Sequence, residues 1–142
     1  MVPSVNILTE EIDETIYPNK TYGIVVKHTG NADASNPVDR IDGYVDDLEA
    51  VKQSIYLILG TERYQFNIYS WDYGVELLDL FGKPIPYVMS ELSRRIKEAL
   101  TQDDRIEDVT DFKFEVNGHK IMTTFTVITT FGNIHNDLEV TI

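Results

Sequence analysis

The C-terminal part of the chain constrains the fold most, because it is patterned as consecutive β-strands joined by tight turns. Three apolar residues alternate with Lys and Glu, as in a strand with one buried face: Phe112, Phe114 and Val116. Asn117-Gly118 predicts a type I′ hairpin turn, and the run from His119 to Phe131 returns the chain. Gly132-Asn133 breaks this run ahead of a last short strand, residues 137–142. These strands predict an antiparallel sheet that needs a covering layer.

Two amphipathic helices supply that layer. The first is predicted over about 47–59, with Asp46 as its N-cap, Glu49 completing a capping box and Gly60 as its stop. The second starts near Pro86 and places its apolar residues on one face: Met89, Leu92, Ile96, Ala99 and Leu100. Its charged residues share another face, which predicts solvent exposure: Glu91, Arg94, Arg95 and Glu98.

The remaining segments complete an α+β domain. Strands are predicted over 22–27 and 38–45 around a loop at 29–37, and a further strand over 62–69 from its alternation. A turn at 70–74 leads into a short helix at 75–81. Residues 1–20 are predicted to be an extended N-terminal arm, and residues 21–142 a single domain. The predicted fold is a mostly antiparallel sheet covered on one face by two helices.

The amino-acid composition limits the classes of partner that the chain can bind. The 142 residues include 24 acids and 12 bases, a formal net charge of -12, which argues against nucleic acid and anionic membranes. Acids collect in residues 1–50 and 101–142, which predicts a solvated acidic surface or, in a large assembly, a surface matched by basic neighbours. The chain has no Cys, which excludes disulfides and thiolate metal sites. We find no leader pattern and no apolar run of membrane-spanning length, and expect a soluble protein.

The sequence shows no motif for catalysis. Its three His residues lie far apart, and it has no HExxH, GxSxG, GxGxxG or Walker sequence. We therefore predict no catalytic residue, no cofactor and no metal. Carboxylates suited to a glycosidase, among them Glu62, Glu76 and Glu91, are too numerous to indicate one. A peptidoglycan hydrolase and a small-molecule or regulatory binding module remain alternatives.

Several sequence blocks occur in the order seen in a known group of phage tail proteins. They are Ile55-Tyr-Leu-Ile-Leu-Gly-Thr-Glu-Arg63, Ile68-Tyr-Ser-Trp-Asp-Tyr-Gly-Val-Glu-Leu77, the helix Leu92–Leu100, Asp103-Asp-Arg-Ile106, and the hairpin from Val109 to Gly132. From Ile55 to Ile142 the chain resembles the baseplate proteins of Bacillus-type defective prophages, within the wider wedge and sheath-initiator family of contractile tails. That family has Glu-Pro-Arg where this chain has Asp103-Asp104-Arg105, so the rigid turn that Pro imposes is missing.

The resemblance implies a structural baseplate component, a sheath initiator, and not an enzyme. Its partners would be baseplate wedge proteins and the tail sheath protein, with tube and hub proteins as further candidates. Many copies would form a symmetric assembly in the baseplate of a virion or tail-like particle, built in the bacterial cytoplasm. Some members of the wider family are labelled lysozymes, which keeps the peptidoglycan hydrolase as an alternative. The sequence leaves open whether the particle is a phage, a defective prophage or a bacteriocin.

Seven residues are candidates for the interface. In the 103–105 turn, Arg105 is expected to bind a partner, or else to pair within the chain with Asp103, Asp104 or Glu107. The others lie between 63 and 74. Trp71 and Tyr73 flank a turn, where they either anchor an interface or fold over the local core. Arg63 is predicted to contact a partner or to clamp a nearby carbonyl or acid, and Gly74 to permit a special backbone angle or a close approach.

Two strands have distinct expected roles in such an interface. In this family, sheath subunits join by adding a strand to a neighbour's sheet, so an exposed edge is required. The run 123–130 has high β propensity and few charges, which suits a central strand. The terminal strand 137–142 is therefore the predicted edge where a partner docks.

Overall fold

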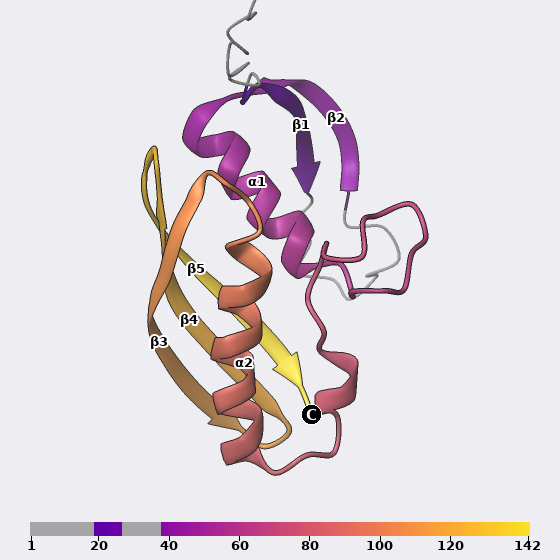
Figure 1. The fold of residues 1–142 in the computed structure, drawn as a ribbon, viewed down its shortest axis with the longest axis vertical. Helices are drawn as coiled ribbons and strands as arrows, with labels where there is room; N and C mark the ends of the chain where they lie inside the picture. Colours follow the sequence, from indigo (N-terminus) through magenta and orange to yellow (C-terminus); the bar gives the residue numbers. More distant parts are fainter. Residues whose placement is uncertain (1–18, 27–37) are drawn as a thin grey trace, which may run out of the picture.

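The computed structural model describes residues 19–26 and 38–142. Its elements are β1 (Thr21–Val26), β2 (Val38–Val45), α1 (Asp47–Leu59), the 3-10 helix η1 (Leu78–Leu80), α2 (Ile85–Leu100), β3 (Ile106–Asn117), β4 (Lys120–Thr129) and β5 (Gly132–Thr141). This order confirms the α+β class (Figure 1). The predicted arm falls almost wholly outside the described residues, and so does the predicted loop at 29–37.

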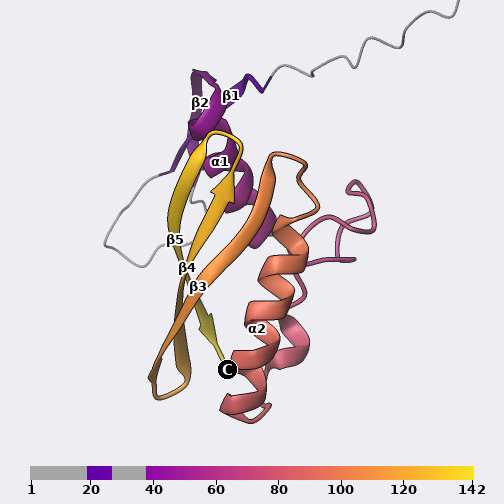
Figure 2. The same cartoon turned by 60° about the vertical axis from the view of Figure 1, so that its left-hand side comes forward.

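The strands form two antiparallel sheets instead of one. β1 pairs with β2, and β4 lies between β3 and β5, which confirms the central position predicted for residues 123–130. Helix α2 packs along the three-stranded sheet, and α1 contacts α2, β1 and β5 (Figures 1 and 2). Gln53 on α1 joins the small sheet to this body, because its side chain accepts from the N–H of Ile24 at 2.9 Å and donates to the Tyr22 carbonyl at 2.8 Å.

The core lies between the helices and the three-stranded sheet. Its largest fully buried apolar side chains are Ile55, Leu80, Leu92, Ile96, Leu100, Ile121, Val51, Val75, Val88, Val109 and Val127. Both helices follow their predicted stripes. Asp46 is the N-cap of α1, but Glu49 pairs with Lys52 at 2.6 Å instead of completing a capping box. Burial of these apolar faces, more than capping, therefore holds the helices in place.

The turn between β3 and β4 differs by one residue from the prediction. Asn117 pairs with Lys120, so the two turn residues are Gly118 and His119 instead of Asn117 and Gly118. Only the first of them has a positive φ, +61° at Gly118. A type I′ turn needs positive φ at both positions, whereas a glycine at the first position alone matches type II′.

The last strand begins earlier than predicted. β5 starts at Gly132 and pairs with β4 from Thr129↔Gly132 to Lys120↔Thr141 without a register shift. The hydroxyl of Thr129 accepts from the Phe131 N–H at 3.2 Å and donates to the Gly132 carbonyl at 2.6 Å. These two bonds close the turn at residues 130–131, so Gly132-Asn133 opens the strand instead of interrupting it.

The predicted strand at 62–69 is wrong. Within it only Glu62 forms a bridge, to Val75, and the rest is turns. The alternating Tyr64, Phe66 and Ile68 are all exposed, because no sheet edge lies beside them to bury one face. The short helix predicted at 75–81 is reduced to the single 3-10 turn of η1.

Candidate functional site

Residues 61–75 form an irregular loop whose two ends are tied together. The Arg63 N–H donates to the Val75 carbonyl at 3.2 Å, and the Val75 N–H donates to the Thr61 carbonyl at 3.0 Å. The Arg63 side chain lies in the same place, with Nε donating to the Gly74 carbonyl at 3.1 Å and Nη1 to Glu98 on α2 at 3.1 Å. Arg63 therefore clamps a carbonyl and an acid of its own chain, the second of the two predicted roles.

Gly74 is required by the backbone. Its φ is +93°, a region that side-chain-bearing residues rarely adopt, and a Cβ there would lie 2.5 Å from the Thr61 carbonyl oxygen. Both parts of the prediction for Gly74, the special angle and the close approach, are thus present. Glu62 closes the other side of the junction, where its carboxylate accepts from the N–H groups of Leu77 and Leu78 at 3.0 and 3.1 Å.

The tip of this loop presents apolar side chains to solvent. The most exposed are Ile68 at 85% and Trp71 at 78%, with Tyr64, Phe66 and Tyr69 also exposed. Tyr73 behaves differently, since it is half-buried and stacks on Tyr69 with a centroid distance of 4.6 Å. Trp71 is thus displayed, as an interface anchor requires, while Tyr73 folds over the local core.

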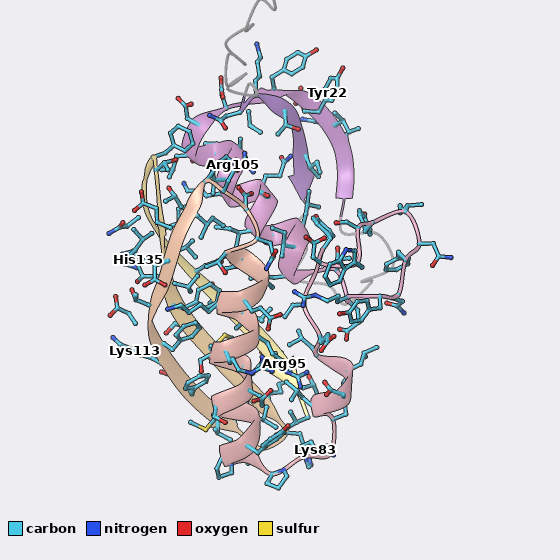
Figure 3. The ribbon with its side chains drawn as sticks, in the orientation of Figure 1. Tyr22, Lys83, Arg95, Arg105, Lys113 and His135 are labelled. Carbon is cyan, nitrogen blue, oxygen red and sulfur yellow. The ribbon has the colours of Figure 1, made fainter. Side chains whose placement is uncertain are left out.

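Arg95 is a structural residue that the sequence did not reveal. It was predicted to lie on the solvated face of its helix, but it is buried (Figure 3). Its guanidinium donates to Glu91 at 3.1 Å, to the Glu76 carbonyl at 2.9 Å, and to both carboxylate oxygens of Asp79. The hydrogen bond with Asp79 raises the pKa of Arg95 further above its usual value, so the residue is a fixed cation joining α2 to η1.

The turn after α2 is closed by an ion pair within the chain. Arg105 donates through Nε to Asp103 Oδ1 at 2.9 Å and through Nη2 to Oδ2 at 2.6 Å. Asp103 Oδ1 also accepts from the backbone N–H of Arg105 at 3.1 Å, which is an Asx turn. This carboxylate therefore fixes the turn for which the resemblance implied a proline. Asp104 between them is exposed.

The loop and the turn are both attached to α1, which leads directly into the loop at Gly60. Burial raises the pKa of the Tyr73 phenol, and the negative charge of Asp103 raises it further. Asp103 also accepts a hydrogen bond from Ser54 on α1 at 3.1 Å. The seven predicted interface residues thus belong to two segments attached to α1, the 61–75 loop and the 103–105 turn, and their contact with a partner stays a prediction.

A third feature is the outer edge of β5. The Ile142 N–H donates to the His119 carbonyl at 2.7 Å, so these two residues form a hydrogen-bonded pair. In an antiparallel ladder, hydrogen-bonded and non-hydrogen-bonded pairs alternate. Ile121↔Val140 is therefore the next hydrogen-bonded pair between β4 and β5, and every second pair after it is hydrogen-bonded too. The N–H and C=O groups of Asp137 and Glu139 consequently point away from β4. A groove of about 530 Å³ runs beside this edge, lined by Tyr56 and neighbouring residues of α1, by Gly60 and Thr61 after it, and by residues 134–139.

The carboxylates considered for hydrolysis, Glu62, Glu76 and Glu91, line neither the groove beside β5 nor the smaller pocket next to it at His135–Asp137. Hydrogen bonds from Arg94 and Arg95 lower the pKa of Glu91, which is the opposite of what a general acid needs. The Glu62 carboxylate is occupied by backbone N–H groups. Among residues 19–26 and 38–142, no group of three or more His, Asp or Glu side chains is arranged to hold a metal ion. The helices in the same part of the chain include none that is long and apolar enough to cross a membrane.

Two comparisons relate the chain to known proteins. The model of the family described as contractile injection system sheath initiator matches residues 27–132. The chain is also similar to phage-like element PBSX protein XkdS of Bacillus subtilis (strain 168), with 42% identity over 90 residues, or 61% of this chain. The aligned region spans 64% of the length of that relative.

Proposed function

Because the chain belongs to the contractile injection system sheath initiator family, we propose that it connects the baseplate wedge to the first sheath ring. Membership of this family makes the chain a structural component of a contractile tail, and the family suggests no enzymatic activity. The connector role has two parts. The β5 edge would receive a strand of the sheath protein, and the 103–105 turn would contact a wedge protein by polar interactions.

The free edge of β5 is the observation that supports the first part. β5 pairs regularly with β4 along its whole length, and no further strand pairs with it among the described residues. β3, at the opposite edge, has two register shifts, near Ile106 and near Asp111. Bulges of this kind twist an edge and discourage pairing, so β5 is the better template for an added strand.

The groove beside β5 supplies specificity. An added strand would bond to the outward N–H and C=O groups of Asp137 and Glu139, and it would replace the hydrogen bond that the Asp137 N–H donates to Asn136 Oδ1 at 3.0 Å. Every second side chain of the added strand would enter the groove against Tyr56. Backbone bonds fix affinity in such a complex, and the groove fixes register. The edge carries two acids, so a strand with Lys or Arg on its exposed face would complement it.

The 103–105 turn supports the second part. Arg105 is only about a quarter exposed and its guanidinium is already paired with Asp103, so its role is to hold the turn in shape. The rigid turn displays the exposed Asp104 next to it. A fixed carboxylate of this kind fits a basic residue of a wedge protein, because little conformational freedom is lost on binding.

Substituting Asp137 by proline tests strand addition directly. Proline removes an N–H that points away from β4, so it blocks pairing with a new strand while leaving the β4 bonds intact. We expect Asp137→Pro to weaken binding to the purified cognate sheath protein by roughly tenfold or more, measured by biolayer interferometry. Asp137→Ala, which keeps the N–H, is the matched control and should bind within about threefold of the unaltered chain. Equal binding by both variants would remove the β5 edge from the interface.

The wedge contact has a separate test. Asp104→Lys reverses the exposed charge without touching the Asp103–Arg105 pair, and we expect it to weaken binding to the cognate wedge protein but not to the sheath. Asp47→Lys, another exposed acid at the start of α1, controls for the change in net charge. If both reversals have the same effect, only net charge matters and the turn has no specific role.

A further inference from the structure

The exposed tip of the 61–75 loop is a second candidate surface, which strand addition at β5 does not use. We call residues 64–71 the aromatic loop. Five of its residues have exposed apolar side chains: Tyr64, Phe66, Ile68, Tyr69 and Trp71. Isolated exposed apolar residues are ordinary, but a cluster in one loop is typical of an interaction site.

The aromatic loop is built to hold a fixed shape. Tyr64 has a φ of +66°, a strained conformation for a bulky residue that costs on the order of tenfold or more in the local equilibrium. It is retained because the loop is tied at its base by Arg63 and Gly74, and within the loop the Tyr69 N–H donates to the Phe66 carbonyl at 3.3 Å. Phe66 packs edge-on to Tyr69, and Tyr69 stacks on Tyr73. Strain kept at an exposed site is more often a feature of function than of stability.

The loop faces away from the three-stranded sheet. In Figure 2 it lies on the far side of α2 from β3, β4 and β5. None of residues 64–71 lines the groove beside β5, which reaches only Gly60 and Thr61 at the base of the loop, so the aromatic loop and the β5 edge offer different residues to a partner. Two independent faces are what a connector between different proteins requires.

The charges around the loop indicate what would bind there. Residues 61–82 contain four acids and one base, and that base, Arg63, is turned inward to Glu98 with its side chain only 10% exposed. A hydrogen bond from Ser70 lowers the pKa of Asp72, so this carboxylate at the edge of the loop is ionised at neutral pH. Aromatic faces and carboxylates both attract Lys and Arg.

The negative net charge of the chain also argues against two other binding partners, a second copy of the chain and a lipid surface. A second copy of the chain would bring together two molecules with a formal charge of -12 each. An anionic lipid surface would be repelled in the same way. The favoured occupant is a protein surface with an apolar pocket bordered by basic residues.

We propose that the aromatic loop is a second docking surface, which inserts Ile68 and Trp71 into an apolar pocket flanked by Lys or Arg on a neighbouring tail protein. The inference rests on the proposed function only in naming a tail protein as the partner. Exposed Trp and Tyr side chains are frequent hot spots, and the rigid loop presents them at a low cost in conformational entropy.

The test uses the full chain and the purified cognate sheath and wedge proteins, each examined separately by biolayer interferometry at low and high ionic strength. We expect the double variant Ile68→Ser/Trp71→Ser to weaken binding to one of them by roughly tenfold or more. Tyr87→Ser, which changes an exposed aromatic on α2, is the matched control and should have little effect. Asp72→Lys should weaken the same interaction, and high salt should weaken it for the unaltered chain. Circular dichroism should show all variants folded, because Ile68, Trp71 and Tyr87 are exposed and Asp72 is only partly buried.

Several results would overturn the proposal. One is wild-type affinity of the double variant for both proteins, and another is binding that responds neither to salt nor to Asp72→Lys. Loop-dependent dimers in analytical ultracentrifugation would assign the surface to a second copy. Loop-dependent binding to phosphatidylcholine or phosphatidylglycerol vesicles would assign it to lipid.

The Asp137→Pro variant separates the two proposals. If it alone loses sheath binding and the double variant binds both proteins normally, the strand-addition proposal stands and the aromatic-loop proposal fails. If only the double variant loses binding, the aromatic loop stands and strand addition fails.

Discussion

The three-stranded sheet and the segment 61–82 are ordered by different means. In the sheet, β4 pairs with β5 along its whole length, so order is shared among many equivalent backbone bonds. In the segment, the only regular element among the described residues is η1, and order depends on a few individual residues, Gly74, Glu62, Arg63 and Arg95. The difference suggests that single substitutions should damage the segment far more than comparable ones damage the sheet.

Glycine substitutions provide the largest expected contrast. At Gly74 a new Cβ would meet the Thr61 carbonyl oxygen at 2.5 Å, and φ is +93°. At Gly118, in the β3–β4 turn, φ is +61° but no atom lies within 4 Å of the new Cβ. We expect Gly74→Ala to lower the free energy of unfolding by about 3 kcal/mol or more and Gly118→Ala by about 1 kcal/mol, measured by urea denaturation. Similar losses would mean that backbone angle alone, and not the close approach, governs the loop.

Two adjacent arginines on α2 give the next contrast. Arg95 is buried and joins α2 to η1, whereas Arg94 makes its ion pairs with Glu91 and Glu98 on the surface. We expect Arg95→Ala to cost about 2 kcal/mol, less than for a fully buried pair because Asp79 is largely exposed. Arg94→Ala should cost much less, because the Arg94 side chain is exposed and its ion pairs are screened by solvent. Thermal denaturation of both variants checks this, and equal costs would show that the Arg95 contacts add nothing to stability.

The same contrast explains what the sequence could and could not predict. The 47–59 helix was predicted correctly because its stripe, N-cap and stop are all local signals. The strand prediction for 62–69 failed because the alternation of Tyr64, Phe66 and Ile68 with polar residues occurs both in strands and in exposed loops. Only the presence or absence of a neighbouring sheet edge distinguishes the two cases. Arg95 was missed because charges at helical spacing give no sign of which one faces a carboxylate brought from elsewhere in the chain. The role of Gly74 was predicted, because a glycine in a turn usually allows a positive φ or a close approach of two backbone segments.

The 103–105 turn offers an intermediate test through pH. Burial opposes the charge of Asp103, but the hydrogen bonds from Arg105 outweigh it and lower the pKa of Asp103 overall. A carboxyl whose pKa is depressed in the folded state stabilises the fold above its unfolded pKa of about 4, and this stabilisation is lost as the pH falls through the lower folded value. We expect Asp103→Asn to cost about 1 kcal/mol at pH about 7 and little at pH about 2, measured by urea denaturation. A cost that does not change with pH would show that the ion pair contributes nothing.

The smallest expected effect lies in the sheet and has the opposite sign. Thr123 on β4 is fully buried, and its hydroxyl has no hydrogen-bond partner. Thr123→Val keeps the shape and the β propensity while removing an unsatisfied polar group, so we expect a gain of about 0.5 to 1 kcal/mol in the free energy of unfolding. Thr126→Val is the matched control, because the Thr126 hydroxyl lies 3.0 Å from His135 Nδ1 and that bond would be lost. A gain at Thr123 with a loss at Thr126 would show that the sheet tolerates, and can even benefit from, changes of single side chains. A loss at both would mean that the Thr123 hydroxyl has a partner in solution and that the sheet, like the segment 61–82, depends on individual polar contacts.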